Sequence, residues 1–154
     1  AVTFGKFFEI PLTDIQKGIA SFTPENNRSQ WIKTKNNHIL LDAYNANPTS
    51  MSAAIESFID VKAKAKLVIL GDMLELGQYT HEEHQAIIDQ LKKGGIDHAI
   101  LVGPHFCASK TEGFSAFKNT AEAKNHLANQ SILDHTILIK GSRGIALEQL
   151  LDQL

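Results

Sequence analysis

The sequence is poor in the features that mark secreted, membrane and nucleic-acid-binding proteins. Its 154 residues include one cysteine, Cys107, which excludes an internal disulfide and suits a reducing compartment. No apolar run approaches the roughly 18 residues of a membrane-spanning helix, and no signal-peptide pattern opens the sequence. The formal net charge of −2 offers no basic surface to nucleic acid or to an anionic membrane. We therefore expect a cytoplasmic protein that binds neither nucleic acid nor a membrane.

The apolar content is ordinary, and a change of pattern divides the chain. Apolar residues make up 43% of it, enough for one buried core. Residues 1–22 read as two helical pieces broken at Pro11, followed by a Pro- and Asn-containing loop, "TPENNRSQ" at 23–30. We place a domain boundary near Asn27. Because the chain begins at Ala1 instead of Met, we interpret it as an excised piece, with routine methionine removal as the alternative.

Strand and helix patterns alternate after the boundary. Apolar strands without alternation, separated by helices, indicate the crossovers of a parallel sheet buried on both faces. A short polar turn joins the first two strands, which predicts a hairpin. The sequence thus predicts an α/β, Rossmann-like doubly wound fold whose mostly parallel six-stranded sheet starts with an antiparallel hairpin. The expected strands are residues 30–34, 38–43, 66–71, 98–103, 115–119 and 135–140. The expected helices are residues 49–61, 80–95, 120–130 and 145–154.

Helix-capping side chains are also predictable. Thr49 or Ser50 can cap the first of these helices, and Thr120 the third. Thr80 and Glu83 have the spacing of a capping box at the second.

Four segments that follow strands are unusually polar or rich in glycine. In an open parallel sheet, ligands bind beyond the carboxyl ends of the strands. We therefore expect these four segments to converge at one edge of the sheet. They are "DAYNANP" at 42–48, "GDMLELG" at 71–77, "GPHF" at 103–106 and "KGSRG" at 140–144.

The first group of candidate residues would suit a nucleotide. Asp42 ends an apolar strand, where a carboxylate can accept hydrogen bonds from a ribose diol, or can instead cap the turn. Asn45 and Asn47 offer amide groups for a base edge or phosphate, although each could simply form the turn. Arg28, in the loop before the first strand, could bind a phosphate through two hydrogen bonds or lie free on the surface.

The second group lies at two other strand ends. Asp72 and Glu75 could hold an ammonium or an arginine, or could be a cap and an exposed charge. Lys140, Ser142 and Arg143 stand among glycines that allow a backbone to approach a ligand. The alternative for these three is the start of a helix with two surface cations.

Other reactive residue types lack a supporting motif. His81 and His84 are three residues apart instead of the four of the His-Glu-x-x-His zinc pattern, so we expect a solvated helix face and no metal site. Cys107 has no motif around it and is expected to be a small buried hydrophobic residue. No serine-nucleophile elbow and no complete nucleotide fingerprint occur.

Five segments in order give the chain a family resemblance. "NNRSQ", "DAYNANPTSM", "VILGDMLELG", "ILVGPHF" and "TILIKGSRG" resemble the carboxyl-terminal domain of the Mur ligases, from about residue 27 to 154. The resemblance implies an ATP- and Mg²⁺-dependent ligase that activates a carboxylate as an acyl phosphate, which an amine then attacks. It also implies that 1–26 are the helical end of the central ATPase domain. The amino-terminal and central domains, with the phosphate-binding loop and the Mg²⁺ ligands, are missing, so 27–154 alone should not catalyse.

The resemblance also assigns the candidates. It places Arg28 at an ATP phosphate, Asp42 near the ribose, and Asn45 and Asn47 along the same nucleotide edge. The acceptor amine would lie near a second set of residues: Lys140, Ser142, Arg143, Asp72 and Glu75.

Asn45 in "YNANP" is the feature that distinguishes branches of the family. Amino-acid-adding and folate-extending relatives usually carry His there, so Asn favours the branch that joins D-alanyl-D-alanine to UDP-N-acetylmuramoyl-tripeptide. Another Mur-type or folylpolyglutamate ligase domain is the alternative within the family. A freestanding α/β binding module is the alternative outside it, and a start codon just before Ala1 would distinguish that case.

Overall fold

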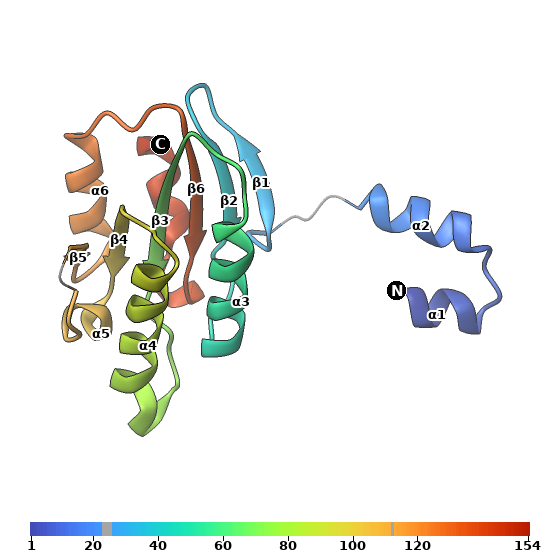
Figure 1. The fold of residues 1–154 in the computed structure, drawn as a ribbon, viewed down its shortest axis with the longest axis horizontal. Helices are drawn as coiled ribbons and strands as arrows, with labels where there is room; N and C mark the ends of the chain where they lie inside the picture. Colours follow the sequence, from blue (N-terminus) through green and yellow to red (C-terminus); the bar gives the residue numbers. More distant parts are fainter. Residues whose placement is uncertain (23–25, 112) are drawn as a thin grey trace.

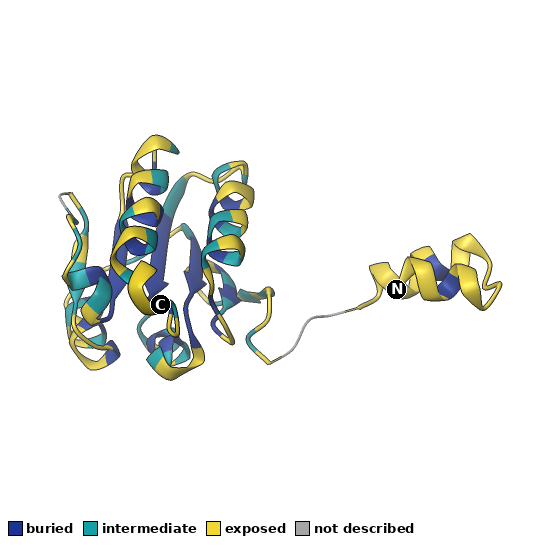
Figure 2. Ribbon diagram, turned by 90° about the horizontal axis from the view of Figure 1, so that it is seen from below, coloured by how far each residue is buried: buried dark blue, intermediate teal, exposed yellow. Residues whose placement is uncertain are grey.

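The computed structural model of the chain describes residues 1–22, 26–111 and 113–154 (Figure 1). The predicted loop at 23–30 lies partly outside these residues. Helices α1 (Val2–Phe7) and α2 (Leu12–Ala20) pack on each other, and the predicted break at Pro11 is confirmed, since Pro11 precedes the first residue of α2. Gly5 allows the close approach, because a Cβ there would lie 2.5 Å from Ile15 Cδ1. Much of segment 1–22, which contains this helix pair, is exposed (Figure 2), including Phe4, Phe7, Phe8 and Phe22.

The predicted sheet is confirmed. Its six strands have the order β1-β2-β6-β3-β4-β5, with β1 and β2 antiparallel and the remaining pairs parallel. The strands are β1 (Gln30–Lys33), β2 (His38–Asp42), β3 (Ala65–Gly71), β4 (Ala99–Val102), β5 (Ser115–Phe117) and β6 (His135–Lys140). The last strand of the chain therefore lies between the second and third.

Helices cover both faces of the sheet, as a doubly wound fold requires (Figure 1). Alternate residues of β3 serve opposite faces: Val68 and Leu70 belong to one apolar cluster, Leu67 and Ile69 to the other. Helices α3 (Pro48–Ile59) and α4 (Thr80–Lys93) contribute to the first cluster. Helix α6 (Thr120–Ala128) and the 3₁₀ segment η3 (Leu147–Gln153) contribute to the second. Short pieces α5 (Pro104–Cys107), η1 (Gly77–Tyr79) and η2 (Arg143–Ile145) complete the loops.

Several predicted helix ends were wrong by one or more residues. Asn47, instead of Thr49 or Ser50, caps α3, and its side chain and that of Ser50 form a reciprocal capping box. Asn119, instead of Thr120, caps α6. The Thr80 capping box is absent from this described turn: η1 runs directly into α4, and the Thr80 hydroxyl donates to the Gly77 carbonyl.

The predicted helix over 145–154 is a 3₁₀ segment instead of an α-helix. It starts after Ala146, whose left-handed backbone (φ 57°) interrupts helical geometry. The chain end is tied to the hairpin turn by Asn37, a buried residue whose amide nitrogen donates to the carbonyls of Leu154 (2.5 Å) and Ile132 (2.9 Å). Its amide oxygen accepts from His135 N–H at 3.0 Å.

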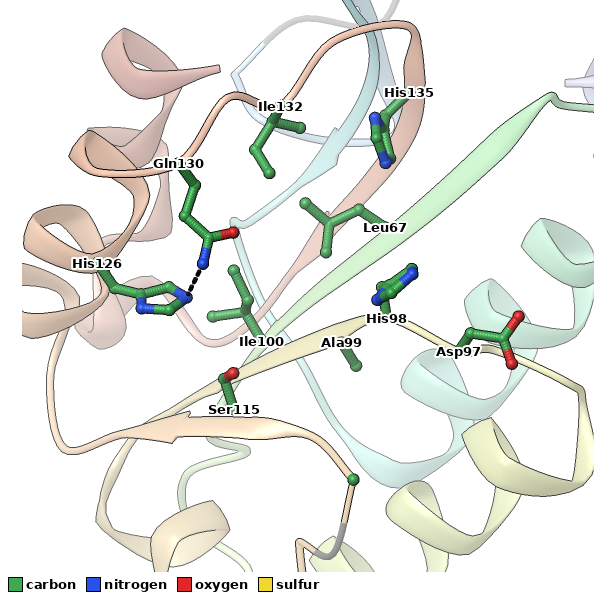
Figure 3. A pocket seen from close by; sticks show the side chains of 11 residues that line it. Leu67, Asp97, His98, Ala99, Ile100, Ser115, His126, Gln130, Ile132 and His135 are labelled. Carbon is green, nitrogen blue, oxygen red and sulfur yellow. Dashed lines mark hydrogen bonds between the residues drawn. The ribbon is translucent and has the colours of Figure 1, made fainter.

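A hollow of about 290 Å³ lies at the edge where the parallel strands begin (Figure 3). His98, His126 and His135 line it, with His126 hydrogen-bonded to Gln130. This is the edge opposite the four polar strand exits. In the part of the chain that the structure describes, each helix is also too short or too polar to cross a membrane.

Candidate functional site

Strand order brings the predicted site residues together. Strands β2, β6 and β3 are neighbours and parallel, so segments 42–48, 140–144 and 71–77 leave the same edge of the sheet side by side. Segment 103–106 follows β4, the next strand along. The predicted convergence of four exits is therefore confirmed. The two predicted groups, separate in the sequence, therefore meet at one edge of the sheet, with Asp72, Lys140 and Ser142 buried.

The centre of this edge is an ion pair between a buried lysine and a partly exposed aspartate. Asp42 and Lys140 are register partners on β2 and β6, so their side chains project from the same face of the sheet. Lys140 Nζ lies 2.5 Å from Asp42 Oδ2 and 3.2 Å from the carbonyl oxygen of Asn45. The Lys140 side chain is 2% exposed, whereas that of Asp42 is 21% exposed. Lys140, predicted on the acceptor side, thus supports the nucleotide-side carboxylate.

Asp42 also fastens the segment that carries Arg28. Its second oxygen, Oδ1, accepts from the Ser29 backbone N–H at 3.2 Å. Ser29 has a left-handed backbone (φ 46°), which turns the chain sharply just after Arg28. The carboxylate retains exposed lone pairs, as a ribose hydroxyl would need.

Tyr44 is a site residue that the sequence reasoning did not single out. Its exposed ring has the guanidinium of Arg28 at 3.9 Å from the centroid and that of Arg143 at 5.5 Å. These are cation–π distances, and they bring an arginine of each predicted group to one aromatic ring. The available signal was an aromatic side chain within an otherwise polar strand exit.

The two asparagines differ in their freedom. Asn45 is exposed, and its carbonyl accepts from Lys140. The side-chain oxygen of Asn47 is engaged as the α3 cap, accepting from Ser50 N–H at 2.8 Å, which leaves its amide NH₂ for a ligand. The predicted nucleotide contact of Asn47 would therefore be a donated hydrogen bond.

Glycines set the position of segment 140–144. A Cβ at Gly141 would lie 2.9 Å from Gly71 Cα, so the two strand exits touch backbone to backbone. Ser142, which is buried, donates its N–H to the Asp72 carbonyl (3.3 Å), and its hydroxyl accepts from Leu74 N–H (3.1 Å). Segments 71–77 and 140–144 are thus joined at two points.

Asp72 and Glu75, predicted together, have different surroundings. Asp72 is fully buried, and its carboxylate accepts from the N–H groups of His105 (2.8 Å) and Phe106 (2.9 Å) at the start of α5. Asp72 thus holds segment 103–106 beside the candidate site, and its own carboxylate is not exposed to a ligand. Glu75 is exposed at a left-handed backbone position (φ 65°). Glu75 is thus the carboxylate of this pair that faces solvent.

His84 was predicted on a solvated face, and that prediction was wrong. His81 is exposed, but His84 is fully buried. The i, i+3, i+4, i+7 spacing of His84, Ile87, Ile88 and Leu91 places it on the inward face of α4. Burial lowers the pKa of His84, an effect that the Thr80 carbonyl and Asp72 partly offset.

Cys107 was predicted to be buried and is only half-buried. Burial, the largest cause, and the nearby Asp72 raise the pKa of its thiol, so the thiol form prevails at neutral pH. A thiol in that state is a poor nucleophile.

The side chains at this edge define which chemical groups it could bind. Among the residues described, no group of three or more His, Cys, Asp or Glu side chains could hold a metal ion. The partly exposed carboxylate of Asp42, two arginines and exposed amides can bind hydroxyl, phosphate and carboxylate groups.

Comparison with known proteins places the chain in a family. The family described as "Mur ligase, glutamate ligase domain" matches residues 27–143. Similar curated proteins are UDP-N-acetylmuramoyl-tripeptide–D-alanyl-D-alanine ligases. That of Rickettsia prowazekii is 32% identical over 88% of this chain and 31% of its own length. That of Escherichia coli is 34% identical over 93% of this chain and 32% of its own length. The chain thus spans about a third of the length of these relatives.

Solved structures agree. MurF from Acinetobacter baumannii superimposes with a TM-score of 0.86 and 31% identity, over 99% of this chain and 35% of that one. MurF ligase from Thermotoga maritima, solved in complex with ADP, has a TM-score of 0.74 and 23% identity, over 87% of this chain and 31% of that one, which shows a shared fold. The chain belongs to the Mur ligase, glutamate ligase domain family.

Proposed function

We propose that this chain is the carboxyl-terminal domain of an ATP-dependent ligase that joins D-alanyl-D-alanine to UDP-N-acetylmuramoyl-tripeptide. The observation that carries the proposal is the continuous edge formed by β2, β6 and β3, where the Asp42–Lys140 pair adjoins two arginines and Ser142. That edge occurs in a chain whose relatives carry this ligase name.

The nucleotide would bind on the β2 side. Asp42, oriented by Lys140, accepts hydrogen bonds from the ribose hydroxyls, and Arg28 binds a phosphate through its planar fork. The exposed amides of Asn45 and Asn47 line the same side. ATP supplies the phosphoryl group that activates the peptide carboxylate. Mg²⁺ would be held mainly by the rest of the enzyme.

The acceptor would bind on the β6 and β3 side. Arg143 is suited to the carboxylate of the dipeptide, and Glu75 to its ammonium group. Ser142 retains a hydroxyl proton to donate after accepting from Leu74 N–H. The work of this domain is positioning: it holds the amine in reach of a carboxylate that other domains hold, which lowers the entropic part of the barrier.

The helix pair α1–α2 supports a division of the chain near residue 27. Phe4 and Phe7 of α1, and Phe22 just after α2, are each more than 70% exposed, which is typical of a surface that packs against another domain. We propose that residues 1–26 end the preceding ATPase domain and that 27–154 form the unit described above. A cytoplasmic location belongs to the same proposal, because ATP is the co-substrate.

Conservative variants of two exposed arginines test the proposal in the full-length ligase. Arg28→Lys should raise the KM for ATP, and Arg143→Lys the KM for D-alanyl-D-alanine, each about tenfold, because lysine keeps the charge but loses the bidentate contact. Lys92→Arg, on exposed α4 surface, is the matched control and should change neither. Unchanged constants in both arginine variants would remove the site assignment. A wild-type enzyme that uses glutamate and ignores the dipeptide would move the chain to another branch.

A further inference from the structure

We propose that His84 is a positioning residue for the acceptor side: its neutral imidazole fixes segment 71–77 so that Ser142 and Glu75 face the acceptor. The inference rests on the proposed function for the identity of the acceptor. The observation behind it is that both ring nitrogens of the buried His84 contact backbone atoms. His84 lies on α4, which adjoins the candidate site and is not part of it.

The two contacts of the ring define one protonation state. Nδ1 lies 2.6 Å from the Thr80 carbonyl oxygen, which can only accept, so Nδ1 carries the proton. Nε2 lies 3.1 Å from the Met73 backbone nitrogen, whose N–H can only donate, so Nε2 is the acceptor. The neutral Nδ1–H tautomer satisfies both contacts, and the charged imidazolium satisfies only the first.

The Met73 contact leads directly to the site. The next backbone N–H, that of Leu74, donates to the Ser142 hydroxyl at 3.1 Å. The residue before Met73 is Asp72, whose carbonyl accepts from Ser142 N–H. His84 therefore holds the middle residue of a three-residue stretch whose two neighbours both contact Ser142.

The rest of the pocket keeps the ring in place. The Phe106 ring meets it edge to face, with centroids 4.6 Å apart, and the His105 ring lies at 5.4 Å. The titratable groups that face His84 are Asp72 from the end of β3, His105 from α5 and His81 from its own helix. Asp72 Oδ1 is 3.5 Å from Nε2, but its carboxylate is already committed to the N–H groups of α5.

Protonation should release the segment. A proton added to Nε2 would remove the acceptor for Met73 N–H and would attract the ring to the Asp72 carboxylate. Segment 71–77 would then lose the hydrogen bond that fixes it at Met73. Because burial holds the pKa of His84 below 6.5, the ordinary histidine value, acceptor binding should weaken only as pH falls below 6.5 and through that lowered pKa. Binding should be constant above it.

Two substitutions separate the two contacts. In His84→Gln, the side-chain oxygen can reach the Nε2 position and accept from Met73 N–H, and it does not titrate. In His84→Asn, the shorter amide can keep the Thr80 contact but does not reach Met73. His81→Gln, at an exposed position on the same helix, is the matched control.

The kinetic test uses the full-length ligase. His84→Asn should raise the KM for D-alanyl-D-alanine about tenfold with little change in the KM for ATP, whereas His84→Gln should stay within about twofold of wild type. The acceptor KM of wild type and His81→Gln should stay constant from pH 7.5 to 6.5 and rise as pH falls further and the His84 ring becomes charged, and that of His84→Gln should not rise with this ring. Equal losses for both substrates, or a wild-type profile unchanged in His84→Gln, would overturn the proposal.

A spectroscopic test is independent of activity. Imidazole ¹⁵N chemical shifts of the 154-residue chain should show His84 as the neutral Nδ1–H tautomer at pH 7. A charged ring or the opposite tautomer would refute the arrangement even if the variants fail to fold. If the wild-type ligase uses a different amino acid acceptor, the proposed function fails, and the same KM comparison with that acceptor still decides the role of His84.

Discussion

Removing the carboxylate of Asp42 should destabilise the domain, because it leaves the Lys140 ammonium buried without a counter-charge. Breaking a buried pair by removing one partner costs about 3–5 kcal/mol. Asp42 is 21% exposed, and the Asn45 carbonyl still accepts from Lys140, so we expect about 2–3 kcal/mol for Asp42→Asn. At about 2–4 °C per kcal/mol for a chain of this size, the thermal midpoint should fall by about 4–12 °C.

A double-mutant cycle measures the pair itself. Lys140→Met removes the buried charge and keeps an apolar stem, so Asp42→Asn combined with Lys140→Met should recover at least half of the loss. Urea unfolding of the four proteins at pH 7.5 gives the coupling free energy. The exposed pair of Lys64 and Asp134 is the control, and Lys64→Met should change stability by less than about 0.5 kcal/mol. A coupling free energy near zero would refute the reasoning that this pair is a buried, mutually dependent unit.

Three further changes test other parts of the structure. Gly103→Ala should lower the free energy of unfolding in urea by about 3 kcal/mol, because φ is 132° there and a Cβ would lie 2.2 Å from Asp72 Cγ. Gly113 also has a positive φ, but a Cβ there would meet open space, so Gly113→Ala should lower it less. Asn37→Ala should cost about 2–3 kcal/mol by the same measurement, since it removes three buried hydrogen bonds, while exposed Asn36→Ala should be nearly neutral. Because the folded-state pKa of His84 is lowered, the neutral ring stabilises the folded domain above about pH 6.5, and this contribution is lost as pH falls through the folded pKa. The free energy of unfolding, measured at pH 7.5 and 5.5, should show this loss in wild type and not in His84→Gln.

Patterns in consecutive residues were sufficient to predict the fold and the sheet edge at which the candidate residues meet. Strands such as 66–71 and 135–140 are apolar at successive positions because both faces of the sheet are covered. A run of apolar residues can be recognised from the sequence alone. The edge that carries the site followed from the same reasoning, because parallel strands end together. The family resemblance supplied the branch and the roles of individual residues, which remain predictions.

Burial and pairing were beyond the reach of local pattern. Asp72 and Glu75 look alike as acids in one loop, yet one is fully buried beneath α5 and the other is exposed. The prediction of a solvated face for His84 rested on its three-residue spacing from His81. Its spacing from Ile87 and Leu91 instead indicates the buried face of α4. The 3₁₀ form of 147–153 follows a left-handed backbone at Ala146. Alanine rarely adopts that conformation, so the sequence does not predict it.

The sequence by itself determined the sheet, its helical layers and the edge at which ligands would bind. Only the tertiary structure decided that β6 inserts between β2 and β3, which pairs Asp42 with Lys140 across 98 positions of chain and brings the two predicted groups of residues to one edge. The physical reason is that hydrophobic periodicity specifies which face of an element is buried. Which distant element covers that face is set by the packing of the whole domain, and so is the protonation state or charge partner of a polar side chain there.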